Sequence, residues 1–188
     1  RLCCPKNARF LDFGGGYGIF TRLMRDFGFD FYWYDKYAAN LVARGFEGSI
    51  RNEKYAGVTA FENFEHFADP VVEIKTILEI TDFILFSTEL IPDPVPAPSE
   101  WWYYCLEHGQ HISLYSRKTL ELIARQNGLF LVTNGTNLHI LSRFPVSRYI
   151  FLIEKIFRRL GLSLFLAGKS KTVSDMEKMI QKQRAEKS

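Results

Sequence analysis

Residues 9–18, RFLDFGGGYG, join a short apolar run to a loop of glycines. The apolar run has the length and composition of a buried strand. Apolar side chains then recur at helical spacing over residues 19–27, until Gly28 ends the pattern. A strand, a glycine-rich turn and a helix in this order are typical of a nucleotide-type cofactor site. Glycines let the backbone approach the ligand, and the helix N-terminus offers unpaired N–H groups.

A second short run, residues 31–34, is aromatic and ends at Asp35. We expect it to form the next buried strand. Asp35 lies 21 residues after Gly14, and a ribose-binding carboxylate is expected roughly 20 residues after the first glycine. The position therefore predicts that Asp35 contacts a ribose.

Strands and helices alternate along the rest of the chain. Further strands are predicted at residues 58–61, 83–86, 129–132 and 138–141, with at most a short one at 48–50. Further helices are predicted at residues 37–44, 69–78 and 117–126, the last two capped by Asp69 and Ser116. Asn134-Gly135 predicts a hairpin turn. The fold class is therefore α/β and Rossmann-like. We expect a mostly parallel sheet of seven strands, helices on both faces, and one antiparallel strand near the C-terminal end.

The glycine spacing separates two classes of cofactor. The dinucleotide pattern G-x-G-x-x-G fails, because its third glycine would fall on Ile19 or Thr21. The residues instead fit an acid followed by alternating glycines, which resembles motif I of class I S-adenosylmethionine (SAM)-dependent methyltransferases. The resemblance implies that the loop cradles the methionine part of SAM and that Asp35 binds its ribose. It also implies that Asp12 holds the loop or the amino group of SAM, and that S-adenosylhomocysteine is the product.

Residues 61–70, FENFEHFADP, extend the likeness. They resemble the E-x-x-E-H-x-x-D-P signature of small-molecule methyltransferases, including ubiquinone-biosynthesis-type O-methyltransferases. Residues 108–116 resemble the loop before the next helix of that group. The resemblance predicts a methyltransferase domain over residues 1–143. Because the chain begins with Arg1 rather than Met, we expect N-terminal residues to be missing.

The resemblance and the element order together give a predicted cofactor site. Its residues are Asp12, Gly14, Gly15, Gly16, Tyr17, Gly18, Asp35, Phe61 and Glu62. Glu62, Glu65 and His66 also resemble the metal-ligand set of some ubiquinone-type O-methyltransferases. We expect no functional metal here, since ligand types alone do not fix a coordination geometry.

Methyl transfer to a hydroxyl needs a group that removes the hydroxyl proton. The catalytic candidates are His111, His66 and Glu65, with His111 preferred because its loop should fold over the strand ends. The alternative for each His is a structural side chain held by its neighbours.

The long segment 88–116 carries an aromatic cluster. We expect it to form a lid over a small-molecule acceptor. Its substrate-binding candidates are Trp101, Trp102, Tyr104 and His108. The alternative is that the rings pack on the sheet edge as a satellite core.

The net charge of +3 is unevenly distributed. Residues 1–143 carry 14 basic and 17 acidic side chains, whereas residues 144–188 carry 10 and 4. An acidic body argues against nucleic acid as a partner. The basic extension contains an amphipathic helix at 147–160 and a polar, Lys-rich helix at 172–186. The first helix packs on the domain, forms a homodimer face, or contacts an anionic membrane surface.

Three cysteines make no disulfide framework, and no signal peptide or membrane span is evident, so we expect a cytoplasmic protein. The sequence thus predicts a SAM-dependent methyltransferase acting on a small-molecule hydroxyl. The alternatives are a non-catalytic SAM-binding scaffold and a methyltransferase acting on protein or RNA. A dinucleotide oxidoreductase is disfavoured by the glycine spacing.

Overall fold

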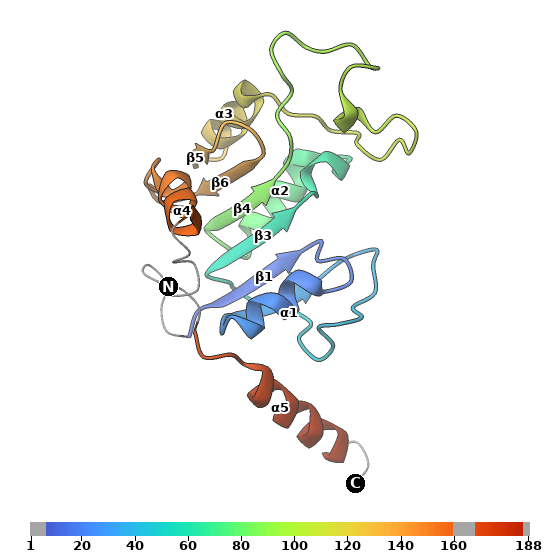
Figure 1. The fold of residues 1–188 in the computed structure, drawn as a ribbon, viewed down its shortest axis with the longest axis vertical. Helices are drawn as coiled ribbons and strands as arrows, with labels where there is room; N and C mark the ends of the chain where they lie inside the picture. Colours follow the sequence, from blue (N-terminus) through green and yellow to red (C-terminus); the bar gives the residue numbers. More distant parts are fainter. Residues whose placement is uncertain (1–6, 160–167, 186–188) are drawn as a thin grey trace.

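The computed structural model describes residues 7–159 and 168–185, which form one six-stranded sheet. The strands are β1 (Arg9–Phe13), β2 (Asp30–Tyr34), β3 (Gly57–Phe61), β4 (Phe83–Ser87), β5 (Phe130–Thr133) and β6 (Leu138–Ser142). Their order is β2-β1-β3-β4-β6-β5 (Figure 1). The first four run parallel, and β6 pairs antiparallel with both β4 and β5. The predicted fold class is confirmed.

The two faces of the sheet are covered by different helices. On one face, β1 and β3 share a hydrophobic core with α2 (Pro70–Leu78) and α3 (Arg117–Gln126). On the other face, Asp12 of β1 accepts a hydrogen bond from Thr21 of α1 (Ile19–Asp26). Successive strand residues point to opposite faces, so buried Leu11 and Phe13 join the core while Asp12 faces α1.

The predicted caps of α2 and α3 are confirmed. Asp69 Oδ1 accepts hydrogen bonds from the backbone N–H groups of Val71 and Val72, each at 3.1 Å. Ser116 Oγ accepts one from Thr119 N at 3.1 Å. Each cap satisfies a donor that the helix itself leaves unpaired.

The helix predicted at 37–44 is wrong, because residues 35–56 form bends and turns. The Asp35 carboxylate takes the N–H groups of Tyr37 and Ala38, and the Asn40 side chain closes a turn on Ala43. Leu41 and its neighbour Val42 are nearly half exposed, so burial of their side chains does not hold this segment in a helix.

The sheet also has six strands among the described residues rather than the predicted seven. Between β2 and β3 the chain makes only an isolated bridge from Glu47 to Trp33 of β2. Trp33 N donates to Phe46 O at 2.8 Å, and Gly48 N donates to Trp33 O at 2.7 Å. The segment covers the open edge of β2 without forming a ladder of its own.

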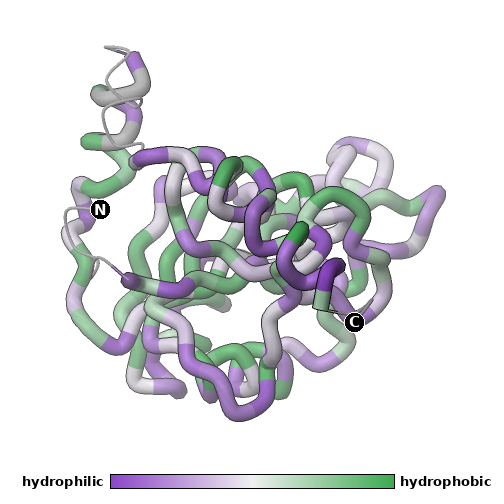
Figure 2. The backbone as a smooth tube through the Cα atoms, turned by 90° about the horizontal axis from the view of Figure 1, so that it is seen from below, coloured by the Kyte–Doolittle hydropathy of each residue, from purple (hydrophilic) through white to green (hydrophobic). Residues whose placement is uncertain are grey.

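Two helices follow the sheet, near both predicted positions: α4 (Ile150–Arg159) and α5 (Thr172–Ala185). α5 lies against α1, where the Arg25 guanidinium meets the Asp175 carboxylate. In contrast, α4 stands away from the body of the molecule (Figure 2). No helix in the part of the chain that the structure describes is long and apolar enough to cross a lipid bilayer.

Candidate functional site

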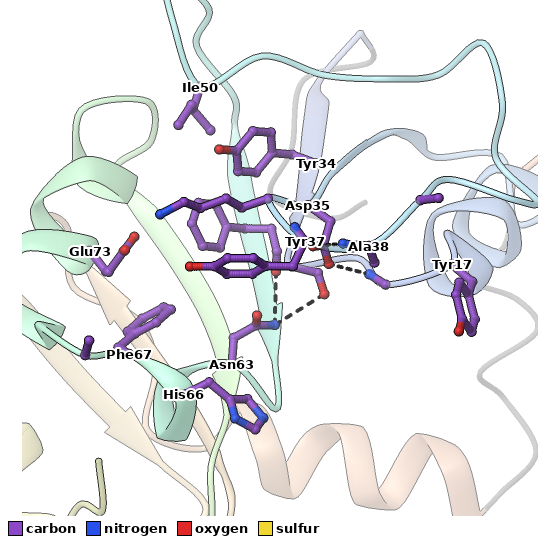
Figure 3. Close-up of a pocket in the computed structure, with 16 residues that line it drawn as sticks. Tyr17, Tyr34, Asp35, Tyr37, Ala38, Ile50, Asn63, His66, Phe67 and Glu73 are labelled. Atoms are coloured by element: carbon purple, nitrogen blue, oxygen red, sulfur yellow. Dashed lines mark hydrogen bonds between the residues drawn. The ribbon is translucent and has the colours of Figure 1, made fainter. Parts of the chain in front are cut away.

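A pocket of about 850 Å³ opens at the carboxyl ends of β1, β2 and β3 (Figure 3). Ligands bind at this edge in open α/β sheets. The lining residues are Phe13, Gly14, Gly16, Tyr17, Tyr34, Asp35, Lys36, Tyr37, Ala38, Ala39, Ile50, Asn63, His66, Phe67, Ala68 and Glu73. The pocket therefore combines the predicted glycine loop and acid with a wall from the segment after β3.

The glycine loop is held in a conformation that needs glycine. Gly14, Gly16 and Gly18 have φ angles of 69°, 53° and 86°, which is the left-handed region. A Cβ on Gly14 would lie 1.9 Å from Asn63 Oδ1. Trp33 Nε1 donates to Gly16 O at 2.9 Å and fixes the tip of the loop. The loop is thus shaped by its own protein neighbours before any ligand arrives.

The Asp35 carboxylate ties two walls of the pocket together. Its Oδ2 accepts a hydrogen bond from Gly16 N at 2.9 Å, and its Oδ1 accepts from Tyr37 N and Ala38 N at 2.7 and 2.8 Å. An ionised carboxylate has about four acceptor sites, so these three bonds leave capacity for a ligand hydroxyl. Asp35 lines the pocket and is available for the ribose role that the resemblance implies.

Asp12 lies beneath the loop rather than among the lining residues. Its carboxylate is buried and accepts hydrogen bonds from Thr59 Oγ1 at 2.9 Å and Thr21 Oγ1 at 3.2 Å. Burial raises the pKa of Asp12 to about 6, although both hydroxyls favour the charged form. From this position Asp12 braces β1, β3 and α1 around the loop.

Four other predicted cofactor residues do not line the pocket: Gly15, Gly18, Phe61 and Glu62. The Glu62 carboxylate accepts hydrogen bonds from Ser87 Oγ at 2.5 Å and from the Tyr103 hydroxyl at 3.2 Å. It therefore points toward the end of β4. Glu62 also has a positive φ of 49°, which turns the chain out of β3 toward the short helix Phe64–His66.

Several lining residues were missed from the sequence, notably Tyr34, Lys36, Tyr37, Asn63, Phe67 and Glu73. For Lys36, Tyr37 and Asn63, the position just after β2 or β3 was the available signal, because residues that follow parallel strands meet at one edge of a sheet. Asn63 is the most informative of them. Its Nδ2 donates to Phe61 O at 2.8 Å and to Phe13 O at 3.2 Å, so it joins the ends of two strands.

The three catalytic candidates lie together. His66 and His111 have ring centroids 5.0 Å apart, and His66 Nε2 lies 3.9 Å from Glu65 Oε1. Nδ1 of His66 lies 2.9 Å from Gln110 O, and Nδ1 of His111 lies 2.7 Å from Tyr103 O. A carbonyl oxygen only accepts, so each Nδ1 donates and each neutral ring keeps its lone pair on Nε2.

Glu65 is fully buried, and neither carboxylate oxygen has a hydrogen-bond partner among the described residues. Burial raises its pKa, and the negative charge of nearby Glu62 adds to the effect. A buried carboxyl without a partner is costly and marks a functional candidate.

The same three side chains could hold a cation. One ligand atom from each of Glu65, His66 and His111 lies within 4.8 Å of the others. Imidazole and carboxylate donors suit several divalent metals. The set differs from the one that the resemblance implied, because Glu62 faces Ser87 and His111 stands in its place.

The aromatic loop packs around a residue that the sequence reasoning did not single out. Tyr103 is fully buried, and the rings of Trp101, Trp102 and His111 lie 5.4, 5.3 and 4.4 Å from its ring. Tyr104 OH donates to Pro96 O at 2.9 Å. None of the predicted substrate-binding residues lines the pocket: Trp101, Trp102, Tyr104 and His108. The cluster instead sits behind His111 and holds its ring.

Comparison with protein families gives one match that decides the family. Residues 1–134 match the family described as "Methyltransferase domain". The chain belongs to this methyltransferase family. The family expected from the glycine loop is thus confirmed. A comparison of this chain with curated proteins found no match.

Solved structures share the fold of this methyltransferase domain. CalO1, a methyltransferase of calicheamicin biosynthesis in a form with bound S-adenosylhomocysteine, has a TM-score of 0.55 and 16% identity over 76% of this chain and 50% of that one. NcsB1 is an O-methyltransferase of neocarzinostatin biosynthesis, in complex with S-adenosylhomocysteine and 1,4-dihydroxy-2-naphthoic acid. It has a TM-score of 0.55 and 16% identity over 73% of this chain and 50% of NcsB1.

A Haloferax volcanii methyltransferase in complex with an activator protein has a TM-score of 0.57 and 15% identity over 77% of this chain and 86% of that one. The chain therefore spans about half the length of CalO1 and NcsB1 and most of the length of the archaeal protein. At these identities the likeness establishes the fold.

Proposed function

We propose that the chain is a SAM-dependent methyltransferase that holds SAM in the pocket at the ends of β1, β2 and β3. The family match over residues 1–134 carries the proposal, since the matched region builds that whole pocket. SAM supplies a methyl group that its sulfonium already makes electrophilic. The protein then has to bind the cofactor, orient the acceptor in line and exclude water.

The lining side chains suit the parts of SAM. Asp35 offers free carboxylate lone pairs to ribose hydroxyls, as described above. Aromatic rings of Tyr34, Tyr37 and Phe67 offer flat apolar surfaces of the kind that hold an adenine. The glycine loop lies directly before the N-terminus of α1 and brings main-chain groups close to the ligand.

We propose a hydroxyl group of a small molecule as the acceptor and His111 Nε2 as the base that removes its proton. The Tyr103 carbonyl holds the Nδ1 proton of His111, so Nε2 is free to accept. His111 does not line the pocket, but its ring lies 5.0 Å from that of His66, which does. The proton transfer is therefore assigned to the edge of the pocket. The aromatic diol bound to the similar protein NcsB1 supports this acceptor class.

The function is tested first by binding. Calorimetry with SAM, S-adenosylhomocysteine and NAD should give heat of binding with the first two only, and binding of NAD alone would refute the proposal. Asp35→Asn should weaken SAM at least about tenfold, because it removes the anionic acceptor at the ribose. Glu121→Gln, an exposed change on α3, is the matched control.

Turnover is tested separately with a panel of phenols and hydroxy acids and labelled SAM. His111→Ala should lower methyl transfer by about 10²–10⁴-fold while leaving SAM binding intact. Unchanged turnover in this variant would remove His111 as the base. SAM binding without transfer to any acceptor in the wild type would favour the non-catalytic scaffold. Activity that persists after treatment with a chelator would agree with the expected absence of a functional metal.

A further inference from the structure

One helix of the domain presents apolar side chains to solvent along a single face. Tyr149, Leu152, Ile153 and Ile156 are 52%, 53%, 49% and 47% exposed. The spacing of three and four residues places Leu152, Ile153 and Ile156 on one side of α4, and Tyr149 directly precedes the helix on that side. Phe144, which precedes the helix, is 48% exposed and extends the apolar surface along the chain.

The body of the protein leaves this face uncovered. Figure 2 shows α4 standing away from the rest of the molecule. Among the residues that the structure describes, the hydrophobic core is built from the sheet, α2, α3 and their connections, and it takes no side chain from α4. An exposed apolar row of this length marks an interaction surface.

The charge around the face indicates what covers it. Residues 143–159 carry one acid, Glu154, and five bases: Arg143, Arg148, Lys155, Arg158 and Arg159. Lys155 and Arg159 are exposed and lie one turn apart, on the side of the helix next to Leu152. The Arg148 guanidinium lies 4.9 Å from the Tyr149 ring centroid and donates to its hydroxyl at 2.7 Å. Cations thus border the apolar row.

This arrangement fits a lipid surface better than a second copy of the chain. Two copies of segment 143–159 packed face to face would bring ten bases together against two acids, and the like charges would repel. An anionic bilayer offers the opposite charge to the basic border and an apolar layer to the row. Because α4 has only ten residues, it is about 15 Å long and lies in the interface rather than across it.

We propose that α4 docks the protein onto an anionic membrane surface, with Leu152, Ile153 and Ile156 inserted between the lipids and Lys155 and Arg159 against the headgroups. A single short helix of this kind binds weakly and reversibly. The domain therefore exchanges between the membrane surface and solution.

The proposal is tested by sedimentation of the complete chain with lipid vesicles. We expect the protein to sediment with vesicles that mix phosphatidylcholine and phosphatidylglycerol and to stay in solution with phosphatidylcholine alone. Raising the salt concentration should weaken the binding, because it screens the headgroup charge. Equal binding to neutral and anionic vesicles would overturn the role of charge, and no binding to either would overturn the proposal.

Substitutions locate the contact. Ile153→Asp with Ile156→Asp should lower partitioning into anionic vesicles at least about tenfold. Val71→Asp with Val72→Asp adds the same charge on α2, at side chains that are 46% and 56% exposed, and is the matched control. Lys155→Glu with Arg159→Glu leaves the apolar row intact and should also abolish binding. Equal sedimentation of the aspartate variant and the control would refute the proposal.

Analytical ultracentrifugation tests whether a second copy of the chain, rather than a membrane, covers the apolar face of α4. We expect a monomer in the absence of vesicles. A dimer that the Ile153→Asp and Ile156→Asp substitutions dissociate, together with no vesicle binding by the wild type, would assign the face to a second copy of the chain. Circular dichroism of each variant checks that the fold is retained.

Discussion

The two C-terminal helices, α4 and α5, are held very differently. Both belong to the basic segment after residue 143. α5 is fixed to α1 by a buried ion pair, in which Arg25 Nε and Nη2 each lie 2.8 Å from an oxygen of Asp175. α4 has a stronger apolar face, yet that face is exposed. Thr172 Oγ1 also donates to Asp26 at 2.7 Å, and Gly168 N donates to Phe27 O at 2.7 Å. Polar contacts centred on the buried Asp175 therefore attach α5, whereas the larger apolar face of α4 stays exposed.

The α5 contact is built around a guanidinium with no exposed surface. Besides Asp175, Arg25 binds Asp30 Oδ1 at 3.0 Å and Phe31 O at 2.8 Å, and it lies 3.7 Å from the Phe46 ring centroid. Because the Arg25 guanidinium is removed from water, losing any one of its hydrogen-bond or ionic partners should destabilise the fold. Gly45 has a φ of 86°, which favours glycine, and the Met179 side chain of α5 lies against it.

The largest expected effect comes from breaking this ion pair. Asp175→Ala should lower the free energy of unfolding by about 3 kcal/mol or more, because it leaves a buried guanidinium without its main counter-charge. Urea unfolding followed by circular dichroism measures the change. Glu177→Ala on the exposed side of the same helix is the control and should cost less than about 0.5 kcal/mol. Equal effects of the two variants would show that the ion pair does not attach α5.

A second expected effect is on the pH dependence of the free energy of unfolding. Asp175 and Asp12, which contact α1 from different elements, should contribute to it with opposite signs. Burial opposes ionisation of Asp175, but the Arg25 and Arg22 guanidiniums outweigh it and hold its pKa below the ordinary value. Its contribution is therefore present above about pH 4 and lost as the pH falls through the lowered pKa. The raised pKa of Asp12, about 6, predicts stability that is lost as the pH rises from about 4 to about 6.

These signs are checked by urea unfolding between pH 3 and pH 8. Asp175→Asn should remove the loss on the acid side. Asp12→Asn should remove the decline toward pH 6, which amounts to about 2–3 kcal/mol for a shift of about two pKa units. If both variants keep the wild-type profile, other groups control the pH dependence.

A smaller effect is expected on the cofactor. α5 contacts α1, whose N-terminus follows the glycine loop, and it contacts Gly45 in the segment after Asp35. Loosening this brace with Asp175→Ala should raise the dissociation constant for SAM about threefold to tenfold, which is up to about 1.4 kcal/mol. Calorimetry at a temperature where the variant is folded measures it. The expectation rests on the proposed function and fails if the affinity is unchanged.

The smallest effect is expected for α4. Ile153→Asp with Ile156→Asp should change the free energy of unfolding by less than about 0.5 kcal/mol, because both side chains are about half exposed and lie outside the hydrophobic core. Thermal and urea unfolding of the same sample measure it. A loss near that of Asp175→Ala would mean that α4 packs on the body as α5 does, and the contrast between the helices would disappear.

Elements set by neighbouring residues were predicted well. The strand before the glycines, the capped starts of α2 and α3 and the hairpin at Asn134-Gly135 depend on contacts within a few residues, which the sequence displays directly. The helix expected at 37–44 failed because the side chains of Asp35 and Asn40 bind the local backbone.

The site was predicted in part for the same reason. Gly14, Gly16, Tyr17 and Asp35 were named from local spacing, and they line the pocket. Phe61 and Glu62 do not, because the positive φ of Glu62 turns its carboxylate toward Ser87. No local pattern shows that turn. Asn63 and Tyr103 likewise have roles that arise only from distant partners.

The sequence by itself determined the sheet, the cofactor loop and the family, because these follow from short-range spacing of glycines, acids and apolar residues. Only the tertiary structure decided which charged groups are buried together. Arg25 meets Asp175 across 150 residues, and His66 meets the loop of His111 across 44. Such contacts depend on how whole elements pack, and a change of a few ångströms in packing would break them. That is why the basic segment after residue 143 divides into one helix held by the domain and one that stands away from it.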